Sequence, residues 1–312
     1  MPMSGTRARA ARSAGAPAVQ APVASFDPRL VTDWFAEHAR DLPWRRPGFS
    51  AWGTLVSEFM LQQTQVARVV PILEEWLRRW PTPADLAAAP PSEVLRAWGR
   101  LGYPRRALAL HACATAIAEQ HGNVVPEDVD TLLALPGIGD YTARAIAVFA
   151  HGHRHPVVDT NVRRVLARAI EGVALPGPPN ARRDLAAMAA LLPAGRAEQR
   201  AFNAGTMELG AIVCTARSPR CGECPLAAVC AWRLAGHPEH VGPAPRRQAR
   251  FEGSDRQLRG RVMAELRAAD VPVTAAELAQ VLPDAAVRSR ILAGLSADGL
   301  AVQADGGWTL PS

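Results

Sequence analysis

Two acidic residues lie in surroundings that favour acid–base chemistry. Glu58 is the only charged residue between Arg46 and Arg68, and its helical neighbours include Leu55 and Leu61. Burying a carboxyl on so apolar a segment raises its pKa, which suits a general acid. The alternative is an exposed glutamate on the wet face of a helix, and the uncharged stretch around Glu58 argues against it.

Asp159 is followed by Asn161 and by a run of helix-forming residues, so it is expected to cap the start of a helix. A capping carboxylate is expected to stay ionised, and it could then stabilise a positive charge in a reacting molecule. One protonated and one ionised carboxyl suit cleavage of a glycosidic bond, in which the departing group needs a proton and the sugar becomes cationic.

Four of the five cysteines lie close together in the spacing Cys214-x6-Cys221-x2-Cys224-x5-Cys230. Four thiolates at this spacing predict one metal centre, and the residues alone leave both zinc and an iron–sulfur cluster open. Between the first two cysteines lie Arg217 and Arg220, which we expect on a basic loop that contacts backbone phosphates. The alternative for this loop is a merely solvated surface.

The segment Leu135-Pro-Gly137-Ile138-Gly139 separates the end of one apolar helix from the start of another. Its two glycines permit a tight turn with positive φ, and the turn exposes backbone N–H groups that could bind a phosphate. Taken alone, the segment is also compatible with an ordinary helical hairpin.

The elements that position these residues are expected to be helices. From residue 26 to about residue 234 the chain shows helical periodicity with short Pro/Gly breaks and almost no strand-like alternation. Residues 251–312 predict three helices, over 255–269, 275–282 and 285–295, followed by a hairpin around Asp305-Gly306. The expected architecture is all-α, with a small winged-helix-like module at the C-terminus.

Composition limits the partners and the chemistry. The net charge of +6 and the pI of about 9.7 suit a polyanion such as DNA. No apolar run is long enough to span a membrane, and the first 25 residues read as a disordered basic tail, so a cytoplasmic protein is expected. All 35 basic residues are arginine, so no lysine side chain exists to form a Schiff base.

Taken together, these motifs resemble the helix-hairpin-helix endonuclease III superfamily of DNA glycosylases, and within it the MutY family of adenine glycosylases. The cysteine spacing is similar to the [4Fe–4S] loop of that superfamily, which places an iron–sulfur cluster well ahead of zinc. The resemblance runs in order through residues 27–234. It is carried further by these segments: Arg40-Asp-Leu-Pro-Trp44, Glu58-Phe-Met-Leu-Gln-Gln-Thr-Gln-Val66, Leu101-Gly-Tyr103, Val158-Asp-Thr-Asn161, Phe202-Asn203 and Glu208-Leu-Gly210.

The resemblance implies a monofunctional enzyme, a monomer, that removes adenine mispaired with 8-oxoguanine or guanine in double-stranded DNA of the bacterial nucleoid. Glu58 and Asp159 would do the chemistry, and Tyr141 and Asn161 would lie beside them. Tyr141 occupies the position at which the lyases of the superfamily carry their catalytic lysine. The residues that would contact the adenine, the wedge or the guanine lesion are Arg40, Leu42, Trp44, Gln63, Thr64, Val66, Leu101 and Tyr103.

The resemblance also implies a division of the chain. A six-helix lobe is expected over about 52–155, and a cluster lobe over about 26–51 plus 156–234; both belong to a catalytic unit of 26–234. A linker over 235–250 joins this unit to the module of 251–312, which does not resemble the Nudix-like domain of other family members. The rivals are a uracil or thymine mismatch glycosylase, a non-catalytic iron–sulfur DNA-binding protein and a zinc-site binding module.

Overall fold

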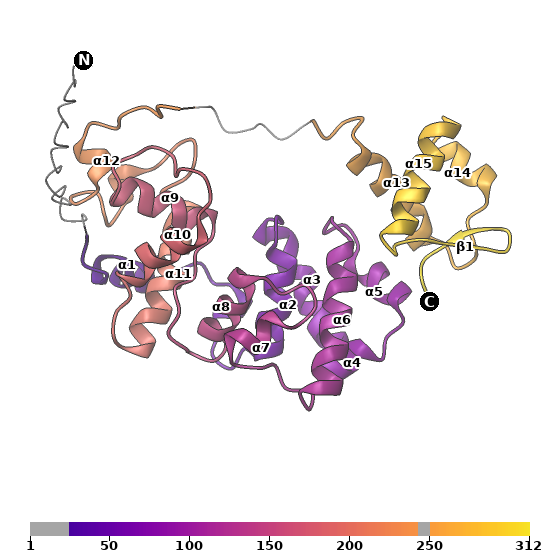
Figure 1. Cartoon of the computed structure of the whole chain (residues 1–312), viewed down its shortest axis with the longest axis horizontal. Helices are drawn as coiled ribbons and strands as arrows, with labels where there is room; N and C mark the ends of the chain where they lie inside the picture. Colours follow the sequence, from indigo (N-terminus) through magenta and orange to yellow (C-terminus); the bar gives the residue numbers. More distant parts are fainter. Residues whose placement is uncertain (1–24, 243–249) are drawn as a thin grey trace, which may run out of the picture.

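The computed structural model describes residues 25–242 and 250–312. The molecule is an elongated row of helical bodies, with the cysteine-rich region at one end and the C-terminal module at the other (Figure 1). Most of the expected N-terminal tail, and the part of the expected linker over residues 243–249, lie outside the described residues. Among the described residues no helix is long and apolar enough to cross a membrane.

The central body is built around a helix that is buried on all sides. Every residue of α2 (Ala51–Leu61) from Trp52 to Met60 is buried. The body has seven helices, where a six-helix lobe was expected, and two of them, α4 and α7, are short segments of five residues each. The helices around α2 are α3 (Val66–Arg79), α4 (Pro83–Ala87), α5 (Pro91–Trp98), α6 (Arg105–Gln120), α7 (Val129–Leu133) and α8 (Asp140–Phe149).

A second body is built from the first and the last segments of residues 26–234, which lie far apart in the sequence. Helix α1 (Arg29–His38) packs against α11 (Arg196–Ile212), and α11 packs against α9 (Thr160–Ala169). Phe26, Val31 and Phe202 share its apolar core. The remaining elements of this body are η1 (Pro43–Arg45), α10 (Ala181–Ala189), η2 (Cys221–Glu223) and α12 (Ala231–Leu234).

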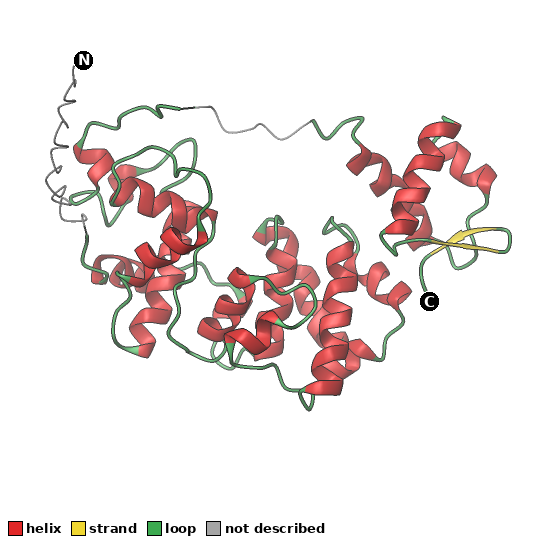
Figure 2. Ribbon diagram, viewed as in Figure 1, coloured by secondary structure: helices red, strands yellow, loops and turns green. Residues whose placement is uncertain are grey.

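The C-terminal module has the three helices and the hairpin expected from the sequence (Figure 2). Thr274 caps its second helix in a reciprocal capping box with Glu277. The two strands pair antiparallel, and Gly306 supplies the positive φ of the turn between them. The elements are α13 (Asp255–Ala268), α14 (Ala275–Val281), α15 (Ala285–Ala297), β1 (Val302–Ala304) and β2 (Gly307–Thr309).

The module does not stand apart from the central body. Its buried residues Val262 and Leu295 belong to the same apolar core as Phe59 of α2. Helix α13 lies against α5, where the Arg96 guanidinium donates hydrogen bonds to the carbonyl oxygens of Arg267 and Ala269, with the second at 2.8 Å. The module is therefore anchored on the central body in a fixed position.

Candidate active site and cluster loop

Glu58 is held inside the central body by the helix that carries it. Ser50 begins α2 by accepting a hydrogen bond from the backbone N–H of Gly53, and the apolar residues that follow bury the helix. Only 8% of Glu58 is exposed. Burial raises the pKa of this carboxyl from 4.5 to about 7, as expected from the uncharged sequence around it. Glu58 therefore retains its proton over much of the range in which a free glutamate is ionised.

Tyr141 lies in the first turn of α8 and donates a hydrogen bond from its hydroxyl to Glu58. Burial and the nearby acidic groups raise the pKa of Tyr141 well above 10, so the phenol remains a donor at neutral pH. The tyrosine can orient the Glu58 carboxyl, but it has no amine with which to attack a sugar.

The turn before α8 positions Tyr141 beside Glu58, and its two glycines, Gly137 and Gly139, have different backbone conformations. Gly137 has a φ of 76°, and a Cβ there would lie 2.9 Å from the Cβ of Ala109 and 3.0 Å from the Phe59 ring. Gly139 instead has a φ of −102° and serves as the N-cap of α8, so the expectation of positive φ holds for Gly137 alone. Ile138 between them points into the core and is 7% exposed.

Asp159 caps α9, as the sequence predicts. Its carboxylate accepts a hydrogen bond of 2.7 Å from the backbone N–H of Val162 and one of 2.8 Å from the side-chain amide of Asn161. Burial nevertheless raises its pKa above the ordinary value, which the sequence did not reveal. The two hydrogen bonds oppose this rise, because they favour the charged form.

The two carboxyls lie close enough for the negative charge of Asp159 to raise the pKa of Glu58. Two like charges at such a distance do not both ionise easily. The backbone N–H and the amide favour charge on Asp159, whereas burial dominates at Glu58. The arrangement therefore favours a proton on Glu58 and a negative charge on Asp159.

Arg164 links Asp159 to the cysteine-rich loop, and sequence analysis missed it. Its Nη2 donates 2.8 Å to Asn161 Oδ1, and Asn161 in turn donates to Asp159. Its Nε donates 2.7 Å to the carbonyl oxygen of Cys214. A continuous set of hydrogen bonds thus joins the first cysteine of the loop to the candidate catalytic aspartate, and its link from Arg164 to Cys214 spans 50 positions of the chain.

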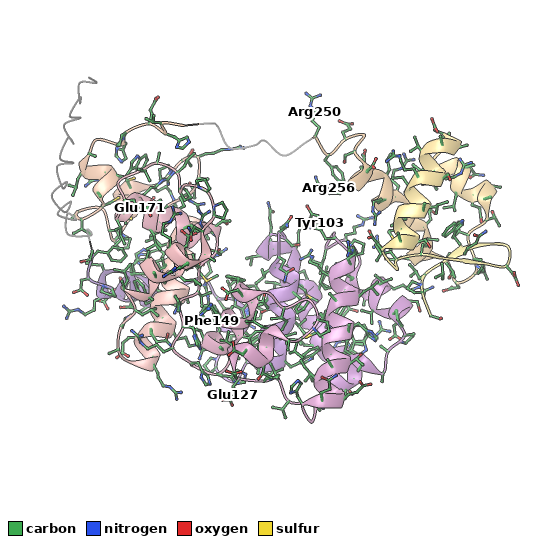
Figure 3. The ribbon with its side chains drawn as sticks, in the orientation of Figure 1. Tyr103, Glu127, Phe149, Glu171, Arg250 and Arg256 are labelled. Atoms are coloured by element: carbon green, nitrogen blue, oxygen red, sulfur yellow. The ribbon has the colours of Figure 1, made fainter. Side chains whose placement is uncertain are left out.

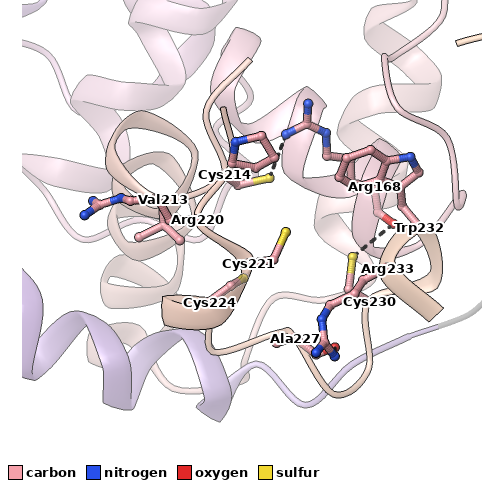
Figure 4. A pocket seen from close by; sticks show the side chains of 11 residues that line it. Arg168, Val213, Cys214, Arg220, Cys221, Cys224, Ala227, Cys230, Trp232 and Arg233 are labelled. Atoms are coloured by element: carbon pink, nitrogen blue, oxygen red, sulfur yellow. Dashed lines mark hydrogen bonds between the residues drawn. The ribbon is translucent and has the colours of Figure 1, made fainter. Parts of the chain in front are cut away.

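The four cysteines line one cavity between α9 and α12 (Figure 4). The buried Arg168 donates 3.4 Å to Cys214 Sγ and stacks on Trp232. Hydrogen bonds to ligand sulfurs and a nearby positive charge suit a group held by several thiolates. Among the described residues, no three His, Cys, Asp or Glu side chains form a site for a single metal ion. The fifth cysteine, Cys113, is buried in the central body, as expected.

Comparison with known proteins identifies the family. A model of the HhH-GPD superfamily of base excision DNA repair proteins matches residues 56–187, and the iron-sulfur binding domain of endonuclease III matches residues 214–230. The adenine DNA glycosylase of Mycobacterium tuberculosis is 55% identical over 297 residues, which cover 95% of this chain and 96% of that protein. The chain belongs to the HhH-GPD superfamily. It is a DNA-binding repair glycosylase, and its cysteines hold a [4Fe–4S] cluster.

Further comparisons agree with this membership. The adenine DNA glycosylase of Mycolicibacterium smegmatis is 57% identical over 288 residues, 92% of this chain and 96% of that protein. A thermostable thymine-DNA glycosylase superposes with a TM-score of 0.60 and 26% identity, over 67% of this chain and 95% of that one. The two mycobacterial proteins align with 95% and 92% of this chain, so the alignments include residues of the C-terminal module.

In this HhH-GPD protein the cluster loop presents its arginines unequally. Arg217 is exposed. Arg220 forms an ion pair of 2.9 Å with Glu223 and also donates to the carbonyl oxygen of Ile212. Of the two expected phosphate contacts, Arg217 is thus the one whose guanidinium faces solvent without an ion pair among the described residues.

Arg40, one of the expected adenine-pocket residues, binds a buried acid to which the sequence analysis assigned no role. Glu208 is 1% exposed and binds both Arg40 and Arg45, at 2.7 and 2.8 Å. These arginines hold the pKa of Glu208 at about 2, although burial alone would raise it. The network fixes the turn that carries Leu42, which is buried, and Trp44, which packs against the central core.

Val66 and the expected wedge residues lie near the start of α3. Val66 is the first residue of that helix, and Gln63 just before it has a φ of 56°. Tyr103 has a φ of 49°, so both wedge residues adopt a left-handed conformation that non-glycine residues rarely use. Thr64 joins their two turns by donating 3.2 Å to the carbonyl oxygen of Leu101.

Arg106 holds the wedge turns together, and no local sequence pattern predicts this role. Its guanidinium donates 3.0 Å to Thr64 Oγ1 and 3.0 Å to the carbonyl oxygen of Gly102. It also donates 2.8 Å to the carbonyl oxygen of Phe59 at the end of α2. One side chain thereby ties the wedge turns to the helix that carries Glu58.

Proposed function

We propose that this glycosylase hydrolyses the N-glycosidic bond of adenine mispaired with 8-oxoguanine or guanine, and stops after releasing the base. The observation that carries the proposal is the pairing of buried Glu58, whose pKa burial raises to about 7, with Asp159, which accepts hydrogen bonds from Val162 and Asn161. The adenine DNA glycosylase names of the mycobacterial relatives support the choice of base. We further propose that the protein acts as a monomer on DNA of the bacterial nucleoid, in the cytoplasm.

The chemistry follows from the two protonation states. Glu58 gives its proton to N7 of the extruded adenine, which makes the base a better leaving group. The Asp159 carboxylate faces the positive charge that develops at C1′, as the second carboxyl does in glycoside hydrolysis. The ionised Glu58 then accepts a proton from the attacking water. Tyr141 orients Glu58, and Asn161 orients Asp159.

The absence of lysine supports a reaction that stops after base release, without cleavage of the DNA strand. Strand cleavage by the lyase route requires an amine that forms a Schiff base with C1′ of the sugar. The whole sequence contains no lysine, and the position from which such an amine would act is occupied by Tyr141. The proposed product is therefore an abasic site in an unbroken strand, together with free adenine.

The surrounding elements supply the grip on DNA. The Gly137–Gly139 turn at the start of α8 offers backbone N–H groups to a phosphate of the adenine strand. Arg217 of the cluster loop offers a second phosphate contact, and Gln63 and Tyr103 enter the helix beside the mispaired guanine. In this proposal residues 26–234 form the catalytic unit and residues 251–312 form an added module.

A single-turnover base-release assay tests the proposal. The intact protein is incubated with duplexes that carry A·8-oxoguanine, A·G or T·G, and the strands are analysed with and without hot alkali, which cleaves abasic sites. We expect release of adenine from the first two duplexes and strand breaks only after alkali. Release of thymine from T·G without release of adenine would contradict the proposal, as would strand breaks before alkali treatment.

Variants of two glutamates test the assigned acid. E58Q keeps the size and a hydrogen-bond acceptor for Tyr141 but has no proton to give, so we expect a loss of about 10²- to 10⁴-fold in the single-turnover rate. Glu75 is a solvent-exposed residue of α3, and E75Q removes the same charge without touching the site. E75Q should retain the wild-type rate. Persistent adenine release by E58Q would remove Glu58 from the mechanism.

A further inference from the structure

A large cavity lies where the C-terminal module meets the central body. Its volume is about 1010 Å³, and it is lined by the two wedge turns on one side and by α13 on the other. Gln63 and Tyr103 both face it. Near its edge the Arg105 guanidinium of the central body lies 3.3 Å from the Asp298 carboxylate of the module. Both bodies therefore build this surface, and neither forms it alone.

The cavity is strongly basic. Seven of its lining residues are arginines, and Asp298 is its one acidic lining residue among the described parts of the chain. The central body contributes Arg68, Arg100, Arg105 and Arg106, and α13 contributes Arg256, Arg259 and Arg267.

The three arginines of α13 lie on one face of that helix. Arg256, Arg259 and Arg267 follow each other at intervals of three and eight residues, with Met263 between them on the same stripe. Arg261 is an exposed residue of the same helix, but it lines a different hollow together with Glu265. The helix thus turns one set of guanidinium groups toward the wedge and another away from it.

The positive charges are only partly neutralised. Asp298 is shared between Arg105 and Arg259, and Arg100 and Arg68 are exposed. Burial lowers the pKa of Arg267, and the charge of Arg100, which lines the same cavity from the central body, lowers it further.

The module also touches the wedge itself. Arg256 Nη1 lies 3.1 Å from the hydroxyl of Tyr103, and Figure 3 shows the two labelled residues next to each other between α13 and the central body. Tyr103 is 39% exposed and holds a strained φ of 49°. A contact from the module therefore reaches the tip of the turn that is proposed to enter DNA.

We propose that this cavity binds the sugar–phosphate backbone of the duplex next to the mispaired guanine, so that residues 251–312 form part of the DNA interface. Guanidinium groups pair with phosphate oxygens through parallel hydrogen bonds, and a row of them on one helix face follows a phosphate backbone. The location beside Gln63 and Tyr103 is continuous with the proposed DNA site. The inference rests on DNA binding by the proposed site and does not require adenine to be the base removed.

The salt dependence of DNA affinity tests this role. Each phosphate neutralised on duplex DNA contributes about 0.9 to the slope of log affinity against log salt concentration. Arg100 and Arg256 are exposed, one on each side of the cavity, so R100Q/R256Q should reduce the slope by about 1.8. R78Q/R261Q is the matched control, because both residues are exposed, one on each body, and both lie outside the cavity.

The measurement uses the intact protein with its cluster and a labelled duplex, with fluorescence anisotropy at a series of salt concentrations. Both an A·G duplex and a fully paired duplex are used, since phosphate contacts do not depend on the base removed. We expect the reduced slope on both duplexes for R100Q/R256Q and a wild-type slope for the control. A wild-type slope for R100Q/R256Q, or an equal reduction in the control, would overturn the inference.

The single variants keep the test decisive if the double variant does not fold. R100Q and R256Q should each reduce the slope by about 0.9, with thermal midpoints that match the wild type. If the wild-type protein released no adenine but R100Q/R256Q still had a smaller salt slope than R78Q/R261Q, the proposed reaction would be contradicted. The DNA-binding role of the module would then remain supported. The two proposals therefore fail in different experiments.

Discussion

Replacing Glu58 by glutamine should stabilise the fold, and the gain should depend on pH. The folded protein raises the pKa of Glu58 from 4.5 to about 7, chiefly because burial penalises the carboxylate. One unit of pKa difference between the folded and unfolded states corresponds to about 1.4 kcal/mol. A pKa of about 7 against 4.5 therefore corresponds to about 3 kcal/mol of destabilisation once the group is ionised.

The sign follows from which state binds the proton. At pH values below 4.5 the carboxyl is protonated in both states, so it does not destabilise the fold. As the pH rises from 4.5 towards 7, the unfolded chain loses the proton while the folded protein keeps it, and stability falls. Above pH 7 the destabilisation has its full value. Glutamine, which carries no charge at any pH, removes it.

Thermal unfolding of the cluster-containing protein at about pH 5 and about pH 8 measures this difference. We expect the E58Q midpoint to exceed the wild-type midpoint by several degrees more at the higher pH. E75Q is the control, since Glu75 is exposed in α3, and its difference from the wild type should change little with pH. A midpoint difference between E58Q and the wild type that is equal at both pH values would refute the assignment of a buried, proton-retaining carboxyl.

Four other predictions follow from the site. The single-turnover rate should fall about tenfold per pH unit above about 7, as Glu58 loses its proton, and a flat rate there would exclude it as the acid. G137A should lower the free energy of unfolding by about 1–3 kcal/mol, because Gly137 has a φ of 76° and an added Cβ would be crowded there. A Cβ added at Gly139 would have no atom within 4 Å, so G139A should change the free energy little in the same denaturation experiments. R164Q should slow base release more than it weakens DNA binding while the brown colour of the cluster persists, and an equal loss in both would point to general unfolding. E208Q should lower the free energy of unfolding by about 3 kcal/mol at neutral pH. This difference from the wild type should become smaller as the pH is lowered from 4.5 towards about 2, the pKa of Glu208 in the folded protein.

Much of the site was predictable because its signals are local. The uncharged stretch around Glu58 is the same feature that buries it, and Asp159 caps the helix that its sequence position predicts. The three helices and the hairpin of the module also follow from local periodicity, capping and turn residues. In each case the residues that determine the structure lie within a few positions of the residue concerned.

The features that escaped prediction depend on residues far apart in the chain. Arg40 and Glu208, which form an ion pair, are separated by 168 positions in the chain. Arg164 and Cys214, which are joined by a hydrogen bond, are separated by 50. No pattern of neighbouring residues could predict either interaction. The basic cavity is formed only when α13 packs against the central body, and periodicity says nothing about which surface a helix meets. The raised pKa of Asp159 likewise arises from burial that neighbouring residues do not specify.

The pairing of α1 with α11 has a consequence for synthesis on the ribosome. The helices of the central body are contiguous in the sequence from Ala51 to Phe149, so they can fold as soon as they emerge. Helix α1 leaves the ribosome first, but its partner α11 begins only at Arg196, roughly 8–33 s later at bacterial rates of translation. During that interval the apolar face of α1 lacks its α11 partner, and the four cysteines of the loop, which begin at Cys214, have not yet been made. Cluster insertion must therefore follow the synthesis of the whole central body and of α11.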